Sequence, residues 1–291
     1  MKITKGLHAL GARVEGMDLS IPLDDATYGR LKHALGEHGV LCYPDQSIEP
    51  IQLKRFAERF GTLEINVANA YQEPGIPEVM VLSNIVQDGK PVGLSDAGQS
   101  WHTDMSYSKT IAFTNILHGL QIPVRDGHSL GNTEFCNMHA AYDALPADMK
   151  QKLEGLTIEH DFNKFWEMMR RERGSNRPPL TGAQRAAKPP VSHPVFLTHP
   201  ITGRRVLYAN PGYATRINGL PAEESQCVLD FLFAHQTEER FRYKHEWCVG
   251  DVLMWDNIGT IHNAVADYRP DEHRLIKRCQ VMADRVFAEA M

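Results

Sequence analysis

The chain has 291 residues, 42% of them hydrophobic, and a formal net charge of −5. A chain of this size can bury a full hydrophobic core, and its mildly acidic charge is not that of a protein that binds nucleic acid. No stretch approaches the about 18 apolar residues that a membrane helix needs, so we expect no membrane partner. Five scattered cysteines and an N-terminus without a long apolar core favour reduced thiols and a cytoplasmic location.

The first half of the sequence predicts three amphipathic helices and two short strands. Asp24 or Asp25 can cap the first helix, in which Leu31 and Leu35 lie four residues apart and share one face. The helices are expected at residues 24–38, about 49–60 and 139–152, and the strands at 40–43 and 79–82.

The second half is rich in short strands separated by turns and has one further helix, predicted at 221–235. Many short strands with few long helices are typical of a jelly roll. We therefore predict a mainly β fold with flanking helices, formed as a single domain over residues 1–291. The strands are expected at 194–198, 204–209, 241–247, 251–255, 261–266 and 274–282.

Residues 162–190 interrupt the strand pattern with many basic residues and four prolines. We interpret this segment as an insertion between strands, part helix and part loop. Long insertions are often lids over a binding site or plain surface excursions, and the composition fits either.

The most informative pattern is Trp101-His102-Thr103-Asp104 together with a distant histidine, His262. In a β-strand His102 and Asp104 point to the same face, where both can bind one metal ion. His262 would complete two imidazoles and one carboxylate on one side of the metal, the set that non-haem Fe(II) oxygenases use. That set leaves positions open for a cosubstrate and O2. The alternative for His262 is a core histidine with a satisfied hydrogen bond.

Two arginines downstream of His262 form the second pattern. Arg274 and Arg278 are four residues apart, which places both on one face of a strand. Two buried arginines carry a heavy desolvation cost unless they bind an anion, and arginine suits bidentate binding of a carboxylate. The alternative is that this polar face is exposed to solvent.

The order of these motifs resembles the taurine dioxygenase and phenoxyacetate-herbicide dioxygenase family, whose members are Fe(II)- and 2-oxoglutarate-dependent oxygenases. The resemblance implies a double-stranded β-helix, which is a cupin-like jelly roll, with helices packed outside. It also implies that His102, Asp104 and His262 bind the iron. It covers nearly the whole chain and includes WHTD at 101–104, FGTLE at 60–64, LYANPGY at 207–213 and WDNIGTIHNAVADY at 255–268.

The resemblance implies roles for three more residues. Arg274 matches the arginine that pairs with the far carboxylate of 2-oxoglutarate, and Thr133 matches the threonine whose hydroxyl helps to hold that carboxylate. Arg278 matches a second arginine, near the metal-side carboxylate or the substrate anion. The family turn Gly-Gly-Asp-Thr reads Leu-Gly-Asn-Thr at 130–133, a local change that retains the threonine.

The substrate positions differ from those of taurine dioxygenase. The histidine and tyrosine that contact the sulfonate there fall on Asn66 and Asn69, and a contact asparagine falls on Gly98. Taurine itself is therefore not the expected substrate. Met105 and Tyr107, expected just past the ligands on the same strand, match further substrate contacts, and Tyr107 is equally compatible with ordinary packing.

With the resemblance, these residues predict a dioxygenase that hydroxylates a small, anionic organic substrate and releases succinate and CO2. Its cofactors would be Fe(II), 2-oxoglutarate and O2, and Asp104 disfavours halogenation, since related halogenases carry a small residue there. Two alternatives stay open: a Zn(II) hydrolase on the same ligands, and a non-catalytic barrel that only binds 2-oxoglutarate. Members of the family are often dimers or tetramers, which implies a homo-oligomer.

Overall fold

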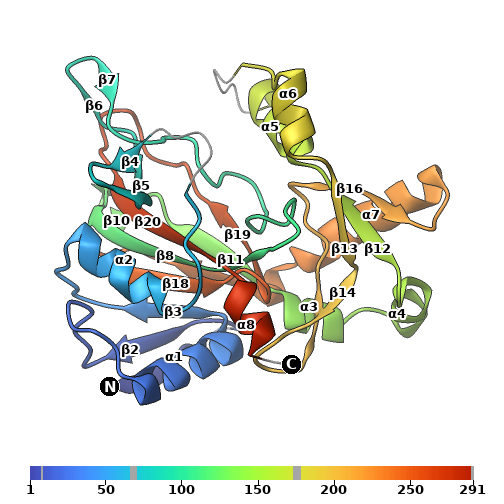
Figure 1. Cartoon of the computed structure of the whole chain (residues 1–291), viewed down its shortest axis with the longest axis horizontal. Helices are drawn as coiled ribbons and strands as arrows, with labels where there is room; N and C mark the ends of the chain where they lie inside the picture. Colours follow the sequence, from blue (N-terminus) through green and yellow to red (C-terminus); the bar gives the residue numbers. More distant parts are fainter. Residues whose placement is uncertain (8, 66–70, 173–177, 290–291) are drawn as a thin grey trace.

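The computed structural model describes residues 1–7, 9–65, 71–172 and 178–289. Its centre is an eight-stranded sheet, and helices α1 (Asp25–His38) and α2 (Pro50–Glu58) pack on one face of it (Figure 1). The strands follow one another in the order β1 (Lys2–Lys5), β2 (Ala12–Glu15), β3 (Val40–Tyr43), β18 (Val252–Asp256), β8 (Ala112–Gln121), β20 (Leu275–Met282), β5 (Ile76–Ser83) and β4 (Gln72–Glu73).

A second sheet packs against the other face of the large one. Its three strands are, in order, β17 (Arg242–His245), β11 (Thr133–Asn137) and β19 (Thr260–Ala264). Two mainly antiparallel sheets that close over one core, with helices outside, form a jelly roll; among the described pairs of these two sheets, β2 and β3 run parallel. The predicted mainly β fold with flanking helices is therefore confirmed.

Apolar side chains of the large sheet alternate between two cores, as the two-residue period of a strand requires. On β18, Val252 and Met254 pack in the same core as the helices. Leu253 and Trp255 belong to the other core, which they share with Trp247 and with residues of the smaller sheet. This second core lies between the two sheets.

A third sheet stands beside the two sheets of the jelly roll (Figure 1). Its strands are β13 (Val191–Pro194), β12 (Thr157–His160) and β16 (Ala214–Asn218), and α5 and α6 stand beyond one end of them (Figure 1). The other helices are α3 (Met138–Asp143), α4 (Ala147–Leu153), α5 (Phe162–Glu172), α6 (Gly182–Ala187), α7 (Ala222–Gln236), α8 (Asp284–Ala288) and the 3-10 turn Glu239–Phe241. Short two-stranded pairs are β14 (Phe196–Thr198) with β15 (Arg205–Leu207), β9 (Val124–Arg125) with β10 (His128–Ser129), and β6 (Val86–Gln87) with β7 (Lys90–Pro91).

Most predicted elements are confirmed, with two corrections. The first helix begins where its cap predicts, since the Asp24 carboxylate accepts the backbone N–H of Thr27 at 2.6 Å. The prediction of one helix over 139–152 is wrong, because the structure has two helices there, separated by residues 144–146. Pro146 disfavours a helical conformation for the residue before it, which ends the first helix. The strand predicted at 194–198 is likewise divided between β13 and β14.

Within the described ranges, 162–190 is part helix and part loop, as predicted. Among the residues that the structure describes, no helix is both long and apolar enough to cross a membrane.

We expect Ile116→Val to lower the free energy of unfolding by about 0.5–1.5 kcal/mol, because Ile116 is fully buried on the central strand β8. Denaturation in urea measures the change. The matched control is Ile51→Val on α2, where the side chain is 55% exposed and the change should stay below about 0.5 kcal/mol. Equal losses at the two positions would contradict the placement of Ile116 in the core.

Candidate metal centre and cosubstrate pocket

His102 and His262 are brought together by the backbone itself. They form an isolated antiparallel bridge, in which the N–H of each donates to the carbonyl of the other, at 2.9 and 2.7 Å. As a result the two imidazole rings lie side by side, with centroids 4.2 Å apart. The two histidines, distant in sequence, are thus adjacent at the middle of β19.

Asp104 reaches the histidines from a turn and not from a strand. His102 makes the single bridge, after which residues 104–107 turn, and Met105 adopts a positive φ of 57°. The expectation of one strand carrying His102, Asp104, Met105 and Tyr107 is therefore wrong, because the backbone leaves the extended conformation at Asp104. The carboxylate nevertheless lies 3.5 Å from Nε2 of His102 and 3.9 Å from Nε2 of His262.

The three side chains form a buried donor set that fits a transition metal. One ligand atom from each lies within 4.8 Å of the other two. His102 donates Nδ1–H to the carbonyl of Ser100 at 2.8 Å, which leaves the Nε2 lone pair for a metal. Two imidazoles and a carboxylate on one side of a site are the ligands that suit Fe(II) and leave positions open.

The electrostatics of the cluster keep Asp104 and His262 in forms that can bind a metal. Burial acts to raise the pKa of Asp104, but the hydrogen bond from His102 and the charge of Arg278 outweigh it, so the carboxyl pKa lies below its usual range. Burial holds the pKa of His262 well below its ordinary value. The site therefore presents an ionised carboxylate and a neutral His262 imidazole.

Two residues hold the Asp104 carboxylate: Arg278, which the sequence placed near the metal, and Asn115, which the sequence-based site did not include. Asn115 of β8 donates its side-chain N–H to Asp104 Oδ2 at 2.6 Å, and Nη1 of Arg278 lies 3.7 Å from the same oxygen. Asp104 Oδ1 is left facing His102. The sequence signal that could have marked Asn115 is an asparagine within a largely apolar strand. The structure buries this side chain completely, so it needs a hydrogen-bond partner.

Two other clusters of potential ligands occur among the described residues, and both have hydrogen-bond roles. His199 donates to Asp256 Oδ2 at 2.9 Å, and the backbone N–H groups of Ile258 and Gly259 also donate to the Asp256 carboxylate. This network shapes the turn that precedes β19. In the second cluster, Cys42, His245 and Asp251, the aspartate accepts the N–H of Cys248 at 2.9 Å.

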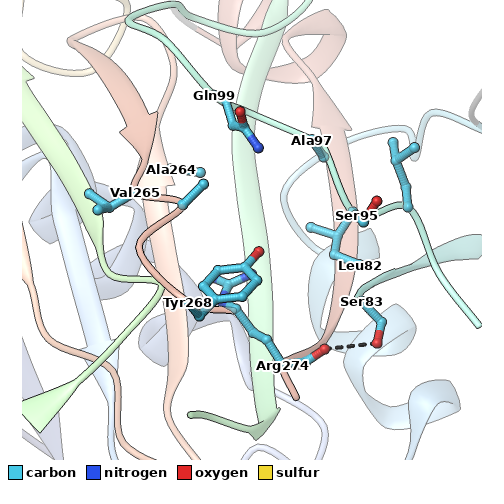
Figure 2. Close-up of a pocket in the computed structure, with 11 residues that line it drawn as sticks. Leu82, Ser83, Ser95, Ala97, Gln99, Ala264, Val265, Tyr268 and Arg274 are labelled. Atoms are coloured by element: carbon cyan, nitrogen blue, oxygen red, sulfur yellow. Dashed lines mark hydrogen bonds between the residues drawn. The ribbon is translucent and has the colours of Figure 1, made fainter. Parts of the chain in front are cut away.

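Figure 2 shows a small pocket that shares strand β19 with the metal cluster. Ala264, two residues after His262, lines one part of it, and Arg274 lines another. Gly98, with a positive φ of 76°, lies so close to His102 that an added Cβ would be 3.7 Å from the imidazole. The remaining lining residues are Leu82, Ser83, Leu94, Ser95, Ala97, Gln99, Val265, Ala266 and Tyr268.

Arg274 places a buried cation in this pocket. Its residue is only 8% exposed, its guanidinium lies 6.0 Å from the Tyr268 ring, and Nε has no hydrogen-bond partner among the described residues. Gly131 makes room for it, since a Cβ there would come within 2.6 Å of Nε. Burial lowers the pKa of Arg274, yet a guanidinium stays charged in proteins. A buried arginine that forms no salt bridge within the described part of the chain is suited to bind an anionic ligand.

The other predicted residues lie around this cluster. Thr133 is buried at the start of β11, opposite Ala264 of β19. Met105 is buried, and the half-buried Tyr107 donates its hydroxyl to Met105 Sδ at 3.0 Å. Asn66 and Asn69 fall outside the described residues.

An aromatic side chain missed in the sequence covers the metal cluster. The Phe165 ring of α5 lies 5.7 Å from that of His102 and stacks on Tyr213 at 5.0 Å. Tyr107 in turn packs against Phe162 at 4.8 Å and Tyr213 at 4.9 Å. These contacts join the 162–190 segment to the candidate site.

Comparison with known proteins agrees with this geometry. The family model described as "Taurine catabolism dioxygenase TauD, TfdA family" matches residues 2–280. The alpha-ketoglutarate-dependent 2,4-dichlorophenoxyacetate dioxygenase of Cupriavidus pinatubonensis is 34% identical, over 98% of this chain and 99% of that protein. Pentalenolactone F synthase of Streptomyces avermitilis is 32% identical, over 95% of this chain and 92% of that protein.

A solved structure extends the likeness to three dimensions. The crystal structure of AAD-2 in complex with Mn(II) and N-oxalylglycine superposes with a TM-score of 0.78 at 28% identity, covering 97% of this chain and 96% of that one. Fold, donor set and relatives together define a 2-oxoglutarate-dependent dioxygenase, an enzyme that uses Fe(II), 2-oxoglutarate and O2. Within that class, the chain belongs to the TauD/TfdA family.

We expect Asn115→Leu to weaken metal binding by about 10–100-fold, because Asp104 loses the donor that orients its carboxylate. Calorimetric titration with Mn(II) measures the affinity, and circular dichroism checks that the fold survives. Ile116→Val, one residue along the same strand, is the control and should bind Mn(II) as the wild type does. An unchanged affinity in Asn115→Leu would contradict the orienting role.

Proposed function

We propose that His102, Asp104 and His262 bind the Fe(II) of this dioxygenase. The observation that carries the proposal is the convergence of their ligand atoms within 4.8 Å in a buried site. Asn115 and Arg278 hold one carboxylate oxygen, which keeps the other directed at the metal position. When bound, the iron lets O2 decarboxylate 2-oxoglutarate to succinate and CO2 and oxidise the substrate.

Arg274 and Thr133 are proposed to bind the distal carboxylate of 2-oxoglutarate. The proposal is supported by the buried guanidinium, which has no anionic partner among the described residues and lines the pocket next to the metal cluster. A charge-assisted pair of this kind is among the stronger polar contacts in proteins. Arg278 is proposed to act at the metal end of the pocket, where it binds the metal-side carboxylate of 2-oxoglutarate or the substrate anion. Its guanidinium lies 3.7 Å from the Asp104 carboxylate, so an anion bound to it would lie beside the metal.

The substrate is proposed to be a small organic anion that this enzyme hydroxylates. The relatives named for 2,4-dichlorophenoxyacetate support an organic acid, and Arg278 supplies a cation at the metal end. Lys188 adds a second cation, with Nζ 4.9 Å from the centre of the Tyr107 ring. Taurine remains disfavoured, because Asn66, Asn69 and Gly98 stand where taurine dioxygenase has its substrate contacts.

The segment 162–190 is proposed to cover the substrate site as a lid within a single domain of residues 1–291. The contact between Phe165 and His102 supports this, because it places α5 directly over a proposed ligand. A homo-oligomer, either a dimer or a tetramer, remains our proposal from the family resemblance. A cytoplasmic location is also proposed, supported by five cysteines that are all free thiols.

We expect Asp104→Ala to abolish substrate-dependent succinate formation while the fold survives, because the metal loses its only carboxylate ligand. Succinate is measured under air and under nitrogen with a panel of organic acids. Succinate formation under air but not under nitrogen identifies the oxygenase. Conversion of the organic acid without O2 would favour a Zn(II) hydrolase. Metal binding with no decarboxylation of 2-oxoglutarate at all would favour a non-catalytic binding protein. Wild-type turnover in Asp104→Ala would refute the ligand assignment.

We expect Arg274→Met to raise the 2-oxoglutarate concentration needed for half-maximal rate by about 30-fold or more, because a buried charge pair is lost. The rate of succinate formation is followed against 2-oxoglutarate concentration. The control is Arg216→Met, because Arg216 is an exposed residue of β16. This variant should leave the 2-oxoglutarate requirement unchanged. The same requirement in Arg274→Met and wild type would rule out this role.

A further inference from the structure

We propose that Trp247 is a positioning residue for 2-oxoglutarate, acting through Thr133. Its indole N–H fixes the Thr133 hydroxyl so that the hydroxyl hydrogen points to the distal carboxylate of the cosubstrate. The inference rests on the proposed function, because it assumes that Thr133 binds this carboxylate.

The contact is a buried hydrogen bond between distant parts of the chain. Trp247 Nε1 donates to Thr133 Oγ1 at 3.1 Å. Trp247 is 1% exposed and Thr133 is 4% exposed, so water does not compete for either group. Trp247 comes two residues after His245, which pairs directly with Thr133 across β17 and β11.

The chemistry of the two groups gives the bond a direction. A hydroxyl has one hydrogen and two lone pairs and can donate or accept, whereas an indole N–H can only donate. The indole therefore occupies a lone pair of Thr133 and leaves the hydroxyl hydrogen to be donated elsewhere. A carboxylate only accepts, so the fixed hydroxyl matches it, and the donated bond from Trp247 strengthens the one that Thr133 makes.

The indole is held in place on several sides. The backbone N–H of Trp247 donates to Asn132 Oδ1 at 3.2 Å, and the His245 ring packs edge-on at 5.0 Å. The indole packs closely against the backbone of Gly119, where an added Cβ would lie only 3.1 Å from indole Cε3. The Asn132 carbonyl accepts the N–H of Val265, which lines the pocket. The indole, Thr133 and the pocket wall are thus joined through one short segment.

Two keto acids separate positioning from packing. 2-Oxopentanoate has the size and metal-binding end of 2-oxoglutarate but carries a methyl group in place of the distal carboxylate. Calorimetry on Mn(II)-loaded protein gives the dissociation constant of each. We expect Trp247→Phe to weaken 2-oxoglutarate binding by about 5–20-fold and to change 2-oxopentanoate binding by less than about twofold.

Variants of Thr133 and Arg216 complete the design. Thr133→Val should show the same selective loss, and the double variant should lose no more than Thr133→Val alone, because both act on one contact. Arg216→Met, an exposed position on β16 outside the proposed site, is the control, and both dissociation constants should be unchanged.

The outcomes distinguish this inference from the proposed function. If Thr133→Val does not reduce the preference for 2-oxoglutarate, the proposed role of Thr133 is wrong and the inference falls with it. If Thr133→Val behaves as expected but Trp247→Phe weakens both keto acids equally, or neither, only the inference is overturned.

A wild-type measurement covers the case in which Trp247→Phe does not fold. In the Zn(II)-loaded protein, the indole N–H resonance of Trp247, assigned by exclusion with the other three tryptophan variants, should shift on adding 2-oxoglutarate. It should move much less with 2-oxopentanoate. Equal shifts with both keto acids would overturn the inference.

Discussion

The site depends on one backbone pairing, the isolated bridge between His102 and His262. Two hydrogen bonds, at 2.9 and 2.7 Å, place the rings of two distant histidines in contact, so the metal cluster is fixed by main-chain geometry before any side chain is considered. The turn that follows then needs to bring in only one carboxylate. Because the bridge joins the entry of that turn to β19, a disturbance of the smaller sheet should reach the proposed ligands.

The charged groups around this pairing are divided between two ends of the site. At the metal end Asp104 is compensated by Arg278 and held by Asn115, so a largely buried carboxylate remains ionised. At the other end Arg274 is a buried cation with no anionic partner among the described residues. A dicarboxylate cosubstrate would neutralise this second charge, which explains why a costly buried arginine is useful here.

The sequence could predict what local patterns and family motifs encode. The alternating strands, the helix capped by Asp24, the proposed ligands and Arg274 all follow from spacing or resemblance. The strand assumed for Asp104 was wrong, because a turn with positive φ at Met105 is not visible in a two-residue spacing. Asn115, Phe165 and Trp247 were missed because their roles arise from contacts between distant strands and helices, which no local pattern records.

The central claim is that three side chains and a buried arginine form one site for Fe(II) and 2-oxoglutarate. Its most direct test is the visible spectrum of the protein under nitrogen, with Fe(II) and 2-oxoglutarate added separately and together. A weak charge-transfer band should appear only with both, persist in Arg216→Met and disappear in Asp104→Ala. Absence of the band in a folded, Fe(II)-loaded wild type, or its survival in Asp104→Ala, would contradict the account.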